Sequence, residues 1–402
     1  MSENLQIDMK STRTANDATE INILVKPFII DISDEKLASI RAKVEAYDWD
    51  LLPDAGGWSA GVGKRDIKRL VNYWLTTYDW PISEKRLNLL PHFTTEIDGE
   101  CIHFIHAKGN GNRPPILLLH GWPGSFIEFE QFIEPLVSDG HTVVVPSLPG
   151  FAFSKPITAP IGTKRAAELM HELMTKLHPN QLFFAQGGDW GHGIAAWMAH
   201  LKPDMLLGIH INMVDLMTKD IEPTTDEERT FVAKRTAILT EETGYSHLQE
   251  TRPQTLGVAI ADSPVGAAAW ILEKFGNWSD LPKTLDGSPD IWSKYSEELL
   301  LTNIMLYVGT SSMVTSTWIY HGKHIEDSQT FPPGTYIRVP TGVAAFRDPV
   351  FRPPPRSFAE KTYNVVRWTD MPAGGHFAAL EQPDLLLADI RAFIAQITEE
   401  SK

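Results

Sequence analysis

The feature that most constrains the fold is an alternation of strand and helix signals between residues 102 and 212. Short apolar runs typical of buried strands are separated by amphipathic stretches of about 10–15 residues typical of helices. The expected strands are Ile102–His106, Pro115–Leu119, Thr142–Pro146, Gln181–Gln186 and Met205–Asn212. The expected helices begin after Ser125, at Thr163 and at Trp190, and end near Val137, Leu177 and Leu201. This alternation predicts an α/β fold with a mostly parallel central sheet covered by helices on both faces.

A long helical and charged block, which we place at residues 215–328, interrupts the alternation. Strand and helix signals return at Thr335–Pro340, Asn364–Trp368 and Pro383–Ile397, so the sheet continues after the block. Such an insertion is expected over the carboxyl ends of the strands, where open α/β sheets bind ligands. The predicted organisation is a flexible tail at 1–22, an aromatic helical segment at 23–97, core at 98–214 and 329–402, and a helical lid at 215–328.

Composition excludes several classes of function. The 402 residues hold 36 Lys and Arg against 51 Asp and Glu, a net charge of −15, without the basic clusters that bind nucleic-acid phosphates. The only cysteine, Cys101, cannot form an internal disulfide or a Cys-rich metal site. The sequence shows neither a signal-peptide core nor a run of about 18–20 apolar residues. We therefore expect a soluble cytoplasmic protein that does not bind nucleic acid.

The sharpest local motif is Gly187-Gly188-Asp189-Trp190-Gly191, between an apolar strand and an apolar helix. Its spacing is that of the G-x-S-x-G nucleophile elbow, with an aspartate where the serine would stand. Small neighbours suit a strained turn, and the N-terminus of the following helix stabilises a carboxylate. Because an aspartate before a helix is also a common N-cap, the context has to decide between a cap and a nucleophile.

Two earlier loops support the nucleophile. His120-Gly121-Trp122-Pro123-Gly124 and Pro146-Ser147-Leu148-Pro149-Gly150 each follow an expected strand. In this arrangement the backbone N–H groups of Trp122 and Trp190 converge as an oxyanion hole beside Asp189.

Together with Gly374–Glu381 near the C-terminus, these motifs resemble those of epoxide hydrolases of the α/β-hydrolase fold. The microsomal type is the most similar, because Asn88–Phe93 with Thr95 and Ile102–Lys108 resemble its N-terminal segment. The resemblance covers residues from about 25 to 397. It implies an α/β-hydrolase core with a helical lid and a helical N-terminal extension. The membrane anchor usual in that family has no counterpart here, so we expect a soluble relative.

The resemblance implies a covalent mechanism in which Asp189 attacks an epoxide carbon and forms an alkyl ester. Hydrolysis of that ester needs a base that activates water, and His376 in its glycine-flanked loop is the candidate. The chain order of nucleophile, acid and histidine is that of α/β hydrolases. Asp348 occupies the usual family position of the carboxylate that orients the base. Asp215 is the alternative, since some hydrolases place their acid after that strand.

Opening an epoxide expels an alkoxide, which needs a proton or strong hydrogen bonds as it departs. Tyrosine hydroxyls in an apolar lid meet this need. Tyr245 matches the first lid tyrosine of the family and Tyr320 matches the second, whereas we expect Tyr307 to pack in the core.

Two other functions stay open at this point. A haloalkane dehalogenase shares the Asp-Trp pair of the elbow, but halide departs without a proton and does not need the tyrosines. A hydrolase-like ligand-binding protein usually lacks the nucleophile or the base, and both are present here. We expect no metal or organic cofactor. The expected partners are water and a small epoxide. The apolar lid segments Ala267–Leu272 and Ile304–Val308 indicate that this epoxide is lipophilic. The aromatic N-terminal segment either clamps the lid within one chain or joins two subunits of a homodimer.

Overall fold

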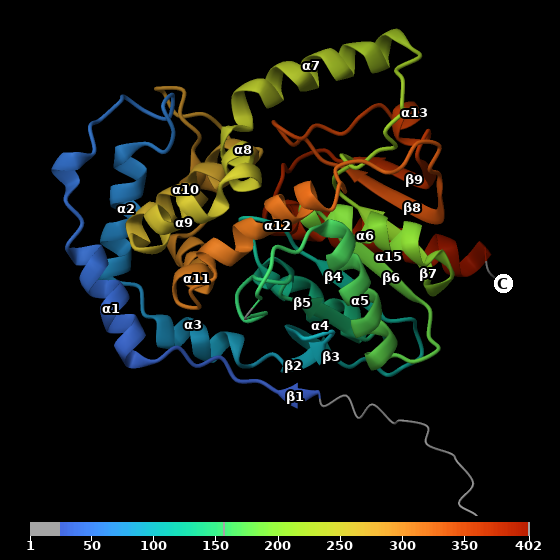
Figure 1. Ribbon diagram of the computed structural model, residues 1–402, viewed down its shortest axis with the longest axis horizontal. Helices are drawn as coiled ribbons and strands as arrows, with labels where there is room; N and C mark the ends of the chain where they lie inside the picture. Colours follow the sequence, from blue (N-terminus) through green and yellow to red (C-terminus); the bar gives the residue numbers. More distant parts are fainter. Residues whose placement is uncertain (1–24, 156, 401–402) are drawn as a thin grey trace, which may run out of the picture.

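The computed structural model describes residues 25–155 and 157–400, so the expected tail at 1–22 lies outside the described residues. Over this range the strands form a nine-stranded sheet in the order β1-β2-β3-β5-β4-β6-β7-β8-β9 (Figure 1). Neighbouring strands from β5 to β9 are parallel, which confirms the predicted mostly parallel sheet. The strands are β1 (Lys26–Pro27), β2 (His92–Ile97), β3 (Glu100–Ala107), β4 (Ile116–Leu119), β5 (Val143–Pro146), β6 (Phe183–Gly187), β7 (Leu206–Ile211), β8 (Ile337–Ala345) and β9 (Tyr363–Asp370).

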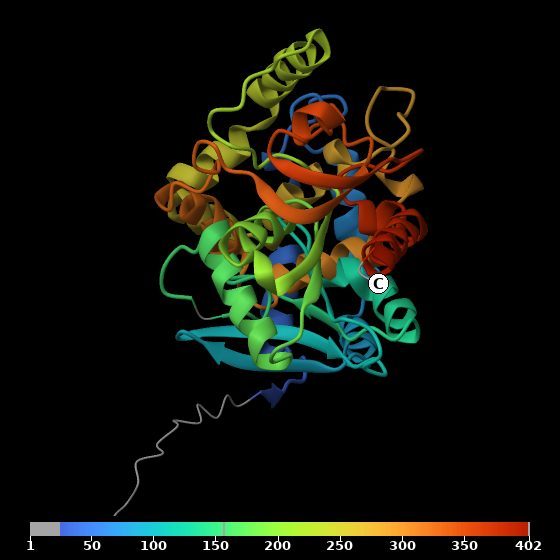
Figure 2. The ribbon, with the colours of Figure 1, turned by 90° about the vertical axis from the view of Figure 1, so that its right-hand side faces the viewer.

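One edge of the sheet is antiparallel. β1, β2 and β3 pair in sequence and β3 runs antiparallel to β5, and Figure 2 shows β2 and β3 as a long ribbon along this edge. The prediction of a helical pattern from Phe28 to about Thr95 is therefore wrong from His92 onward, where β2 begins. The turn between β2 and β3 is Asp98-Gly99, where φ is 50° and 83°. An Asp-Gly pair readily adopts positive φ at both residues and is a strong sequence signal for a hairpin, so this dipeptide indicated the β2–β3 turn.

Apolar strands and amphipathic helices form the core. Every residue of β4 and β5 is buried, as expected for parallel strands covered on both faces. In Figure 2, α5 and α6 cover one face, and α4 and α15 cover the other. These helices are α4 (Glu130–Ser138), α5 (Thr163–Leu177), α6 (Trp190–Leu201) and α15 (Pro383–Glu400). Two short helices, α13 (Arg356–Ala359) and α14 (Ala378–Glu381), come before α15 in the chain.

Six helices between β7 and β8 form the lid. They are α7 (Asp226–Glu242), α8 (Gly244–Thr251), α9 (Pro253–Ala261), α10 (Pro264–Trp278), α11 (Glu297–Val308) and α12 (Met313–Ile325). Trp190, just after β6, packs edge-to-face on Tyr320 of α12 with ring centroids 4.5 Å apart, so the lid covers the carboxyl end of the central strands. Within the described ranges no single helix is long and apolar enough to cross a membrane; the bent pairs α9–α10 and α11–α12 reach that length and composition only as pairs.

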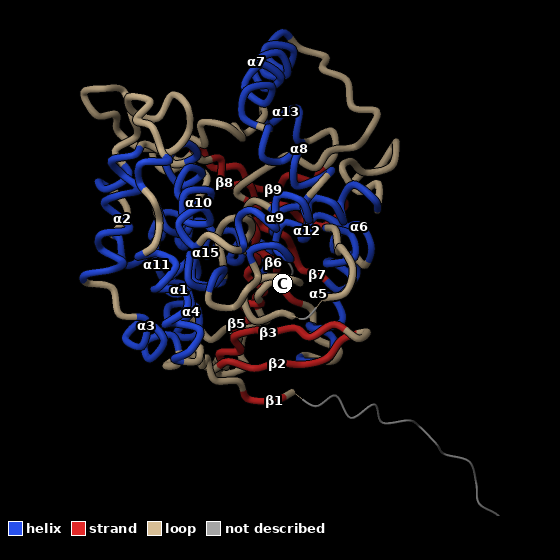
Figure 3. Tube along the Cα trace, turned by 60° about the vertical axis from the view of Figure 1, so that its left-hand side comes forward, coloured by secondary structure: helices blue, strands red, loops and turns tan. Residues whose placement is uncertain are grey.

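The N-terminal helices lie against the lid of the same chain. α1 (Asp34–Glu45), α2 (Lys64–Thr76) and α3 (Trp80–Leu87) flank α10 and α11 in both Figure 1 and Figure 3. The Asp66 carboxylate of α2 accepts hydrogen bonds from the indoles of Trp58 and Trp292, each 2.8 Å long. Arg69 of α2 lies 2.7 Å from the Glu297 carboxylate of α11. These contacts clamp the lid within one chain.

Candidate active site

Asp189 lies at the turn between β6 and α6, with a φ of 42°. A positive φ is strained for a residue with a side chain, and such strain concentrates at functional sites. The glycines on either side are required by close approach. A side chain on Gly187 would overlap the backbone of Gly191, and a side chain on Gly191 would overlap the carbonyl of Leu119. The motif therefore has the tight geometry expected of a nucleophile elbow.

The loop after β4 supplies a donor to this carboxylate. The backbone N–H of Trp122 donates to Oδ1 of Asp189 over 2.7 Å, and Gly121 has no side chain that would overlap this oxygen. Trp190, the second predicted donor, is the first residue of α6. His120 has a structural role, because its Nε2 accepts the N–H of Leu148 over 3.1 Å.

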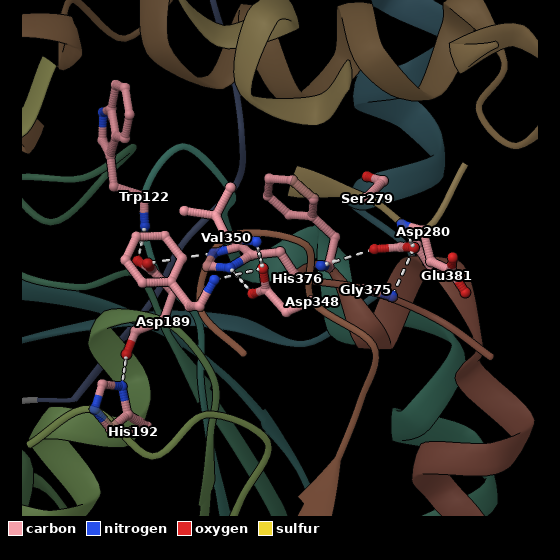
Figure 4. A network of polar contacts seen from close by, with 12 residues as sticks. Trp122, Asp189, His192, Ser279, Asp280, Asp348, Val350, Gly375, His376 and Glu381 are labelled. Atoms are coloured by element: carbon pink, nitrogen blue, oxygen red, sulfur yellow. Dashed lines mark hydrogen bonds and ion pairs between the residues drawn. The ribbon is translucent and has the colours of Figure 1, made fainter. Parts of the chain in front are cut away.

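His376 lies between two carboxylates (Figure 4). Its Nδ1 is 2.7 Å from Oδ2 of Asp348, and its Nε2 is 3.3 Å from Oδ2 of Asp189. Asp348 is itself held, because its Oδ1 accepts the backbone N–H groups of Val350 and Phe351, each over 2.8 Å. Asp215 instead forms an ion pair with Arg235. The structure thus brings Asp348, and not Asp215, to the imidazole.

The charges around His376 favour its imidazolium form. Burial would lower the pKa of the imidazole, but Asp348 and Asp189 outweigh burial and raise the pKa to about 10. Part of this effect depends on Asp189 being an anion. A reaction that converts Asp189 to a neutral ester lowers the pKa of His376 and makes it a base.

Tyr245 of α8 and Tyr320 of α12 lie together in the cavity that contains Asp189. Both side chains are buried, and their ring centroids are 5.8 Å apart. Burial, with the negative charge of Asp189 adding to it, raises the pKa of both hydroxyls well above the usual value, so both keep their protons. Among the described residues the Tyr320 hydroxyl makes no well-formed hydrogen bond, although it lies near the Tyr245 hydroxyl and the Trp190 indole. The Tyr307 hydroxyl is used structurally, since it donates to the carbonyl of Gly124.

The cavity has a volume of about 130 Å³. Its lining combines apolar side chains, including Met213, Leu216, Leu239 and Phe351, with a larger number of polar ones, including Asp215, Lys323 and Gln329. The expectation that Ala267–Leu272 and Ile304–Val308 provide its apolar surface is wrong. Within the part of the chain that the structure describes, neither segment lines this cavity, because α10 and α11 bury these side chains against neighbouring helices.

Several residues that position the base were not assigned from the sequence. The Glu381 carboxylate accepts the backbone N–H groups of Asp280, Gly375 and Phe377 over 2.8–2.9 Å, which fixes the loop on both sides of His376. The N–H of His376 donates to the carbonyl of Trp278 at the end of α10, so the lid helps to hold the base. The available sequence signal for a role of Glu381 was its position at the end of the Gly374–Glu381 motif. Among the described residues no group of three or more His, Cys, Asp or Glu side chains is arranged to hold a metal ion.

Comparison with known proteins agrees with this geometry. Residues 25–129 match the family model described as the epoxide hydrolase N terminus, and residues 114–236 match the alpha/beta hydrolase fold. The chain is 40% identical to a putative epoxide hydrolase of Stigmatella aurantiaca, over 93% of this chain and 85% of the relative. It is 34% identical to epoxide hydrolase 1 of Sus scrofa, over 94% and 90% of the two chains.

Solved structures extend the similarity to three dimensions. Aspergillus niger epoxide hydrolase is 30% identical, with a TM-score of 0.79 over 93% of this chain and 97% of that one. Juvenile hormone epoxide hydrolase of Bombyx mori is 28% identical, with a TM-score of 0.84 over 94% and 96%.

Proposed function

This chain belongs to the epoxide hydrolases of the α/β-hydrolase fold, and from that premise we propose that it converts a lipophilic epoxide to a vicinal diol through an ester on Asp189. One observation carries the mechanism. The Asp189 carboxylate shares a cavity with two protonated tyrosines and also lies 3.3 Å from a base already paired with a second carboxylate. The family assignment does not favour the haloalkane dehalogenase alternative.

In the first step Asp189 attacks an epoxide carbon, and the carbon–oxygen bond of the ring breaks. The departing oxygen becomes an alkoxide, which accepts hydrogen bonds from Tyr245 and Tyr320 and takes a proton from one of them; the proton that His376 releases after ester formation balances this transfer. Both hydroxyls are suited to donate because burial keeps them neutral.

In the second step water hydrolyses the ester. Once Asp189 is a neutral ester, the pKa of His376 falls, so the imidazole loses its proton and can accept one from water. Attack of the water oxygen on the ester carbon gives a tetrahedral intermediate whose oxyanion is the former carbonyl oxygen, and the N–H of Trp122 is already in place for it, 2.7 Å from Oδ1 of Asp189. Collapse of this intermediate releases the diol and returns the carboxylate.

Isotope labelling under single-turnover conditions tests this proposal. An excess of enzyme is mixed with an aryl epoxide in ¹⁸O-labelled water, and the protein and the diol are analysed by mass spectrometry. We expect unlabelled diol from the first turnover and one labelled oxygen in the peptide that contains Asp189. Label found directly in the first-turnover diol would mean that water attacks the epoxide itself, and the proposal would fail.

The substrate class and setting are also proposals. Met213, Leu216, Leu239 and Phe351 in the cavity wall support a lipophilic substrate. A cytoplasmic location is supported by the free thiol of Cys101, which suits a reducing compartment, and cell fractionation tests it. A homodimer remains a prediction that sedimentation of the purified chain tests.

A further inference from the structure

Asp189 separates two cavities. The larger one contains the two lid tyrosines, and a smaller one of about 20 Å³ is lined by His376. In the described part of the chain, Asp189 is the one residue that lines both. About 10–15 Å³ of such space accommodates one water molecule, so the smaller cavity has room for one or two.

The smaller cavity also contains a carboxyl group that the mechanism has not used. Glu128 belongs to the short helix η2 (Phe126–Phe129), directly after the loop that carries Trp122. Glu128 is partly buried, and its side chain lines the cavity together with Asp189 and His376. Among the groups that influence its charge the only cation is His376, since no Lys or Arg of the described residues pairs with it.

The loop after β4 leaves space for this carboxyl group. A side chain on Gly124 would overlap Oε1 of Glu128, just as a side chain on Gly121 would overlap Oδ1 of Asp189. The two glycines of the His120–Gly124 loop therefore leave room for two carboxyl groups. The place of Glu128 beside the nucleophile depends on Gly124 as the place of Asp189 depends on Gly121.

The base has one long contact at the nitrogen that faces this region. In the described chain, Nε2 of His376 is buried and lies 3.3 Å from Oδ2 of Asp189, without a well-formed hydrogen bond. Buried polar atoms are normally paired, by protein or by ordered water. A water in the small cavity would satisfy this nitrogen, and Glu128 offers it an acceptor on another side.

We propose that the small cavity holds the hydrolytic water, and that Glu128 positions this water against the ester on the face opposite the substrate. This inference rests on the ester mechanism proposed above. The Glu128 carboxylate accepts one hydrogen bond from the water, and the other water proton passes to Nε2 of His376. The water oxygen forms a bond to the carboxyl carbon of Asp189, and the bond from that carbon to the substrate oxygen breaks. The proton left on the carboxyl group passes to the diol oxygen, and Glu128 neither gains nor loses a proton overall.

Electrostatics link this role to the second step. Burial and the charge of Asp189 raise the pKa of Glu128 to about 8, while His376 and a backbone N–H of Ser125 partly offset them. Ester formation removes the charge of Asp189, which raises this pKa, and the loss of the His376 proton removes the charge that lowers it, so burial keeps the pKa of Glu128 raised and Glu128 becomes a better acceptor as the pH rises. An ionised carboxylate is a stronger hydrogen-bond acceptor than a neutral acid.

Single-turnover kinetics of Glu128→Gln and Glu128→Leu test the inference. Tryptophan fluorescence and intact-protein mass follow formation and hydrolysis of the ester from an aryl epoxide. Loss of a hydrogen bond to a charged group corresponds to about 10–150-fold in rate. We expect ester formation within about threefold of wild type and hydrolysis slowed about tenfold or more, with Glu128→Leu slower than Glu128→Gln because it lacks any acceptor.

Glu134→Gln is the matched control, because Glu134 is an exposed carboxylate on the following helix. It should leave both steps unchanged. Equal slowing of both steps in the Glu128 variants would mean a structural role, and unchanged hydrolysis would mean that water is held elsewhere; either result overturns the inference. Should Glu128→Leu fail to fold, the isosteric Glu128→Gln decides.

The labelling experiment on wild type distinguishes failure of the ester mechanism from failure of the water-site assignment. If no label enters Asp189, the ester mechanism itself fails. If label enters Asp189 and the Glu128 variants hydrolyse their ester at the wild-type rate, only the assignment of the water site fails.

Discussion

Replacing Tyr320 with phenylalanine should slow ester formation without a loss of stability. The residue is 2% exposed, and its hydroxyl makes no well-formed hydrogen bond among the described residues, although it lies near the Tyr245 hydroxyl and the Trp190 indole. A buried hydroxyl without a good partner costs about 1–3 kcal/mol, so its removal should leave the free energy of unfolding unchanged or raise it by about 1 kcal/mol. A hydrogen bond to the developing alkoxide is worth about 1.5–3 kcal/mol, which corresponds to about 10–150-fold in the rate of ester formation.

Stopped-flow fluorescence under single-turnover conditions measures the rate of ester formation, and urea unfolding measures stability. Tyr363→Phe is a matched control, because the Tyr363 hydroxyl is also buried but donates to the carbonyl of Leu216. This control should lose about 1–3 kcal/mol of stability and keep its rate of ester formation within about threefold. The reasoning would be refuted if Tyr320→Phe formed the ester at the wild-type rate, or if it lost as much stability as Tyr363→Phe.

Three further predictions concern the base. His376→Gln should trap the ester, with hydrolysis about 10²–10⁴-fold slower and the enzyme mass increased by the mass of the substrate; rapid full turnover would contradict this assignment. Asp348→Asn should slow hydrolysis by about 10²-fold or more in the same assay, whereas Asp215→Asn, which removes only the partner of Arg235, should have an effect of less than about fivefold. The pKa of His376 is raised to about 10 from an unfolded value near 6.5, so its contribution to stability is complete below about pH 6.5 and is lost as the pH rises toward 10. Thermal melts from about pH 7 to 9.5 should therefore show wild type losing more Tm than His376→Gln, and parallel curves would refute the raised pKa.

The sequence by itself determined the local structure and the identity of the reacting groups. Periodicity placed α5 at Thr163–Leu177 and α6 at Trp190–Leu201 with the bounds that the structure shows. Glycine spacing identified the turn at Asp189, because only residues without side chains fit that close approach. These features depend on neighbours a few residues apart, and local patterns record such neighbours directly.

Only the tertiary structure decided which distant groups meet. The choice between Asp348 and Asp215 depended on where two loops end after different strands, which no spacing along the chain specifies. The same holds for Glu128, whose sequence surroundings are those of an ordinary helix start, although folding brings its side chain into one cavity with Asp189. Strand order and packing set these distances, and burial then sets the charges, since a carboxyl group acquires its pKa from the groups that folding brings around it.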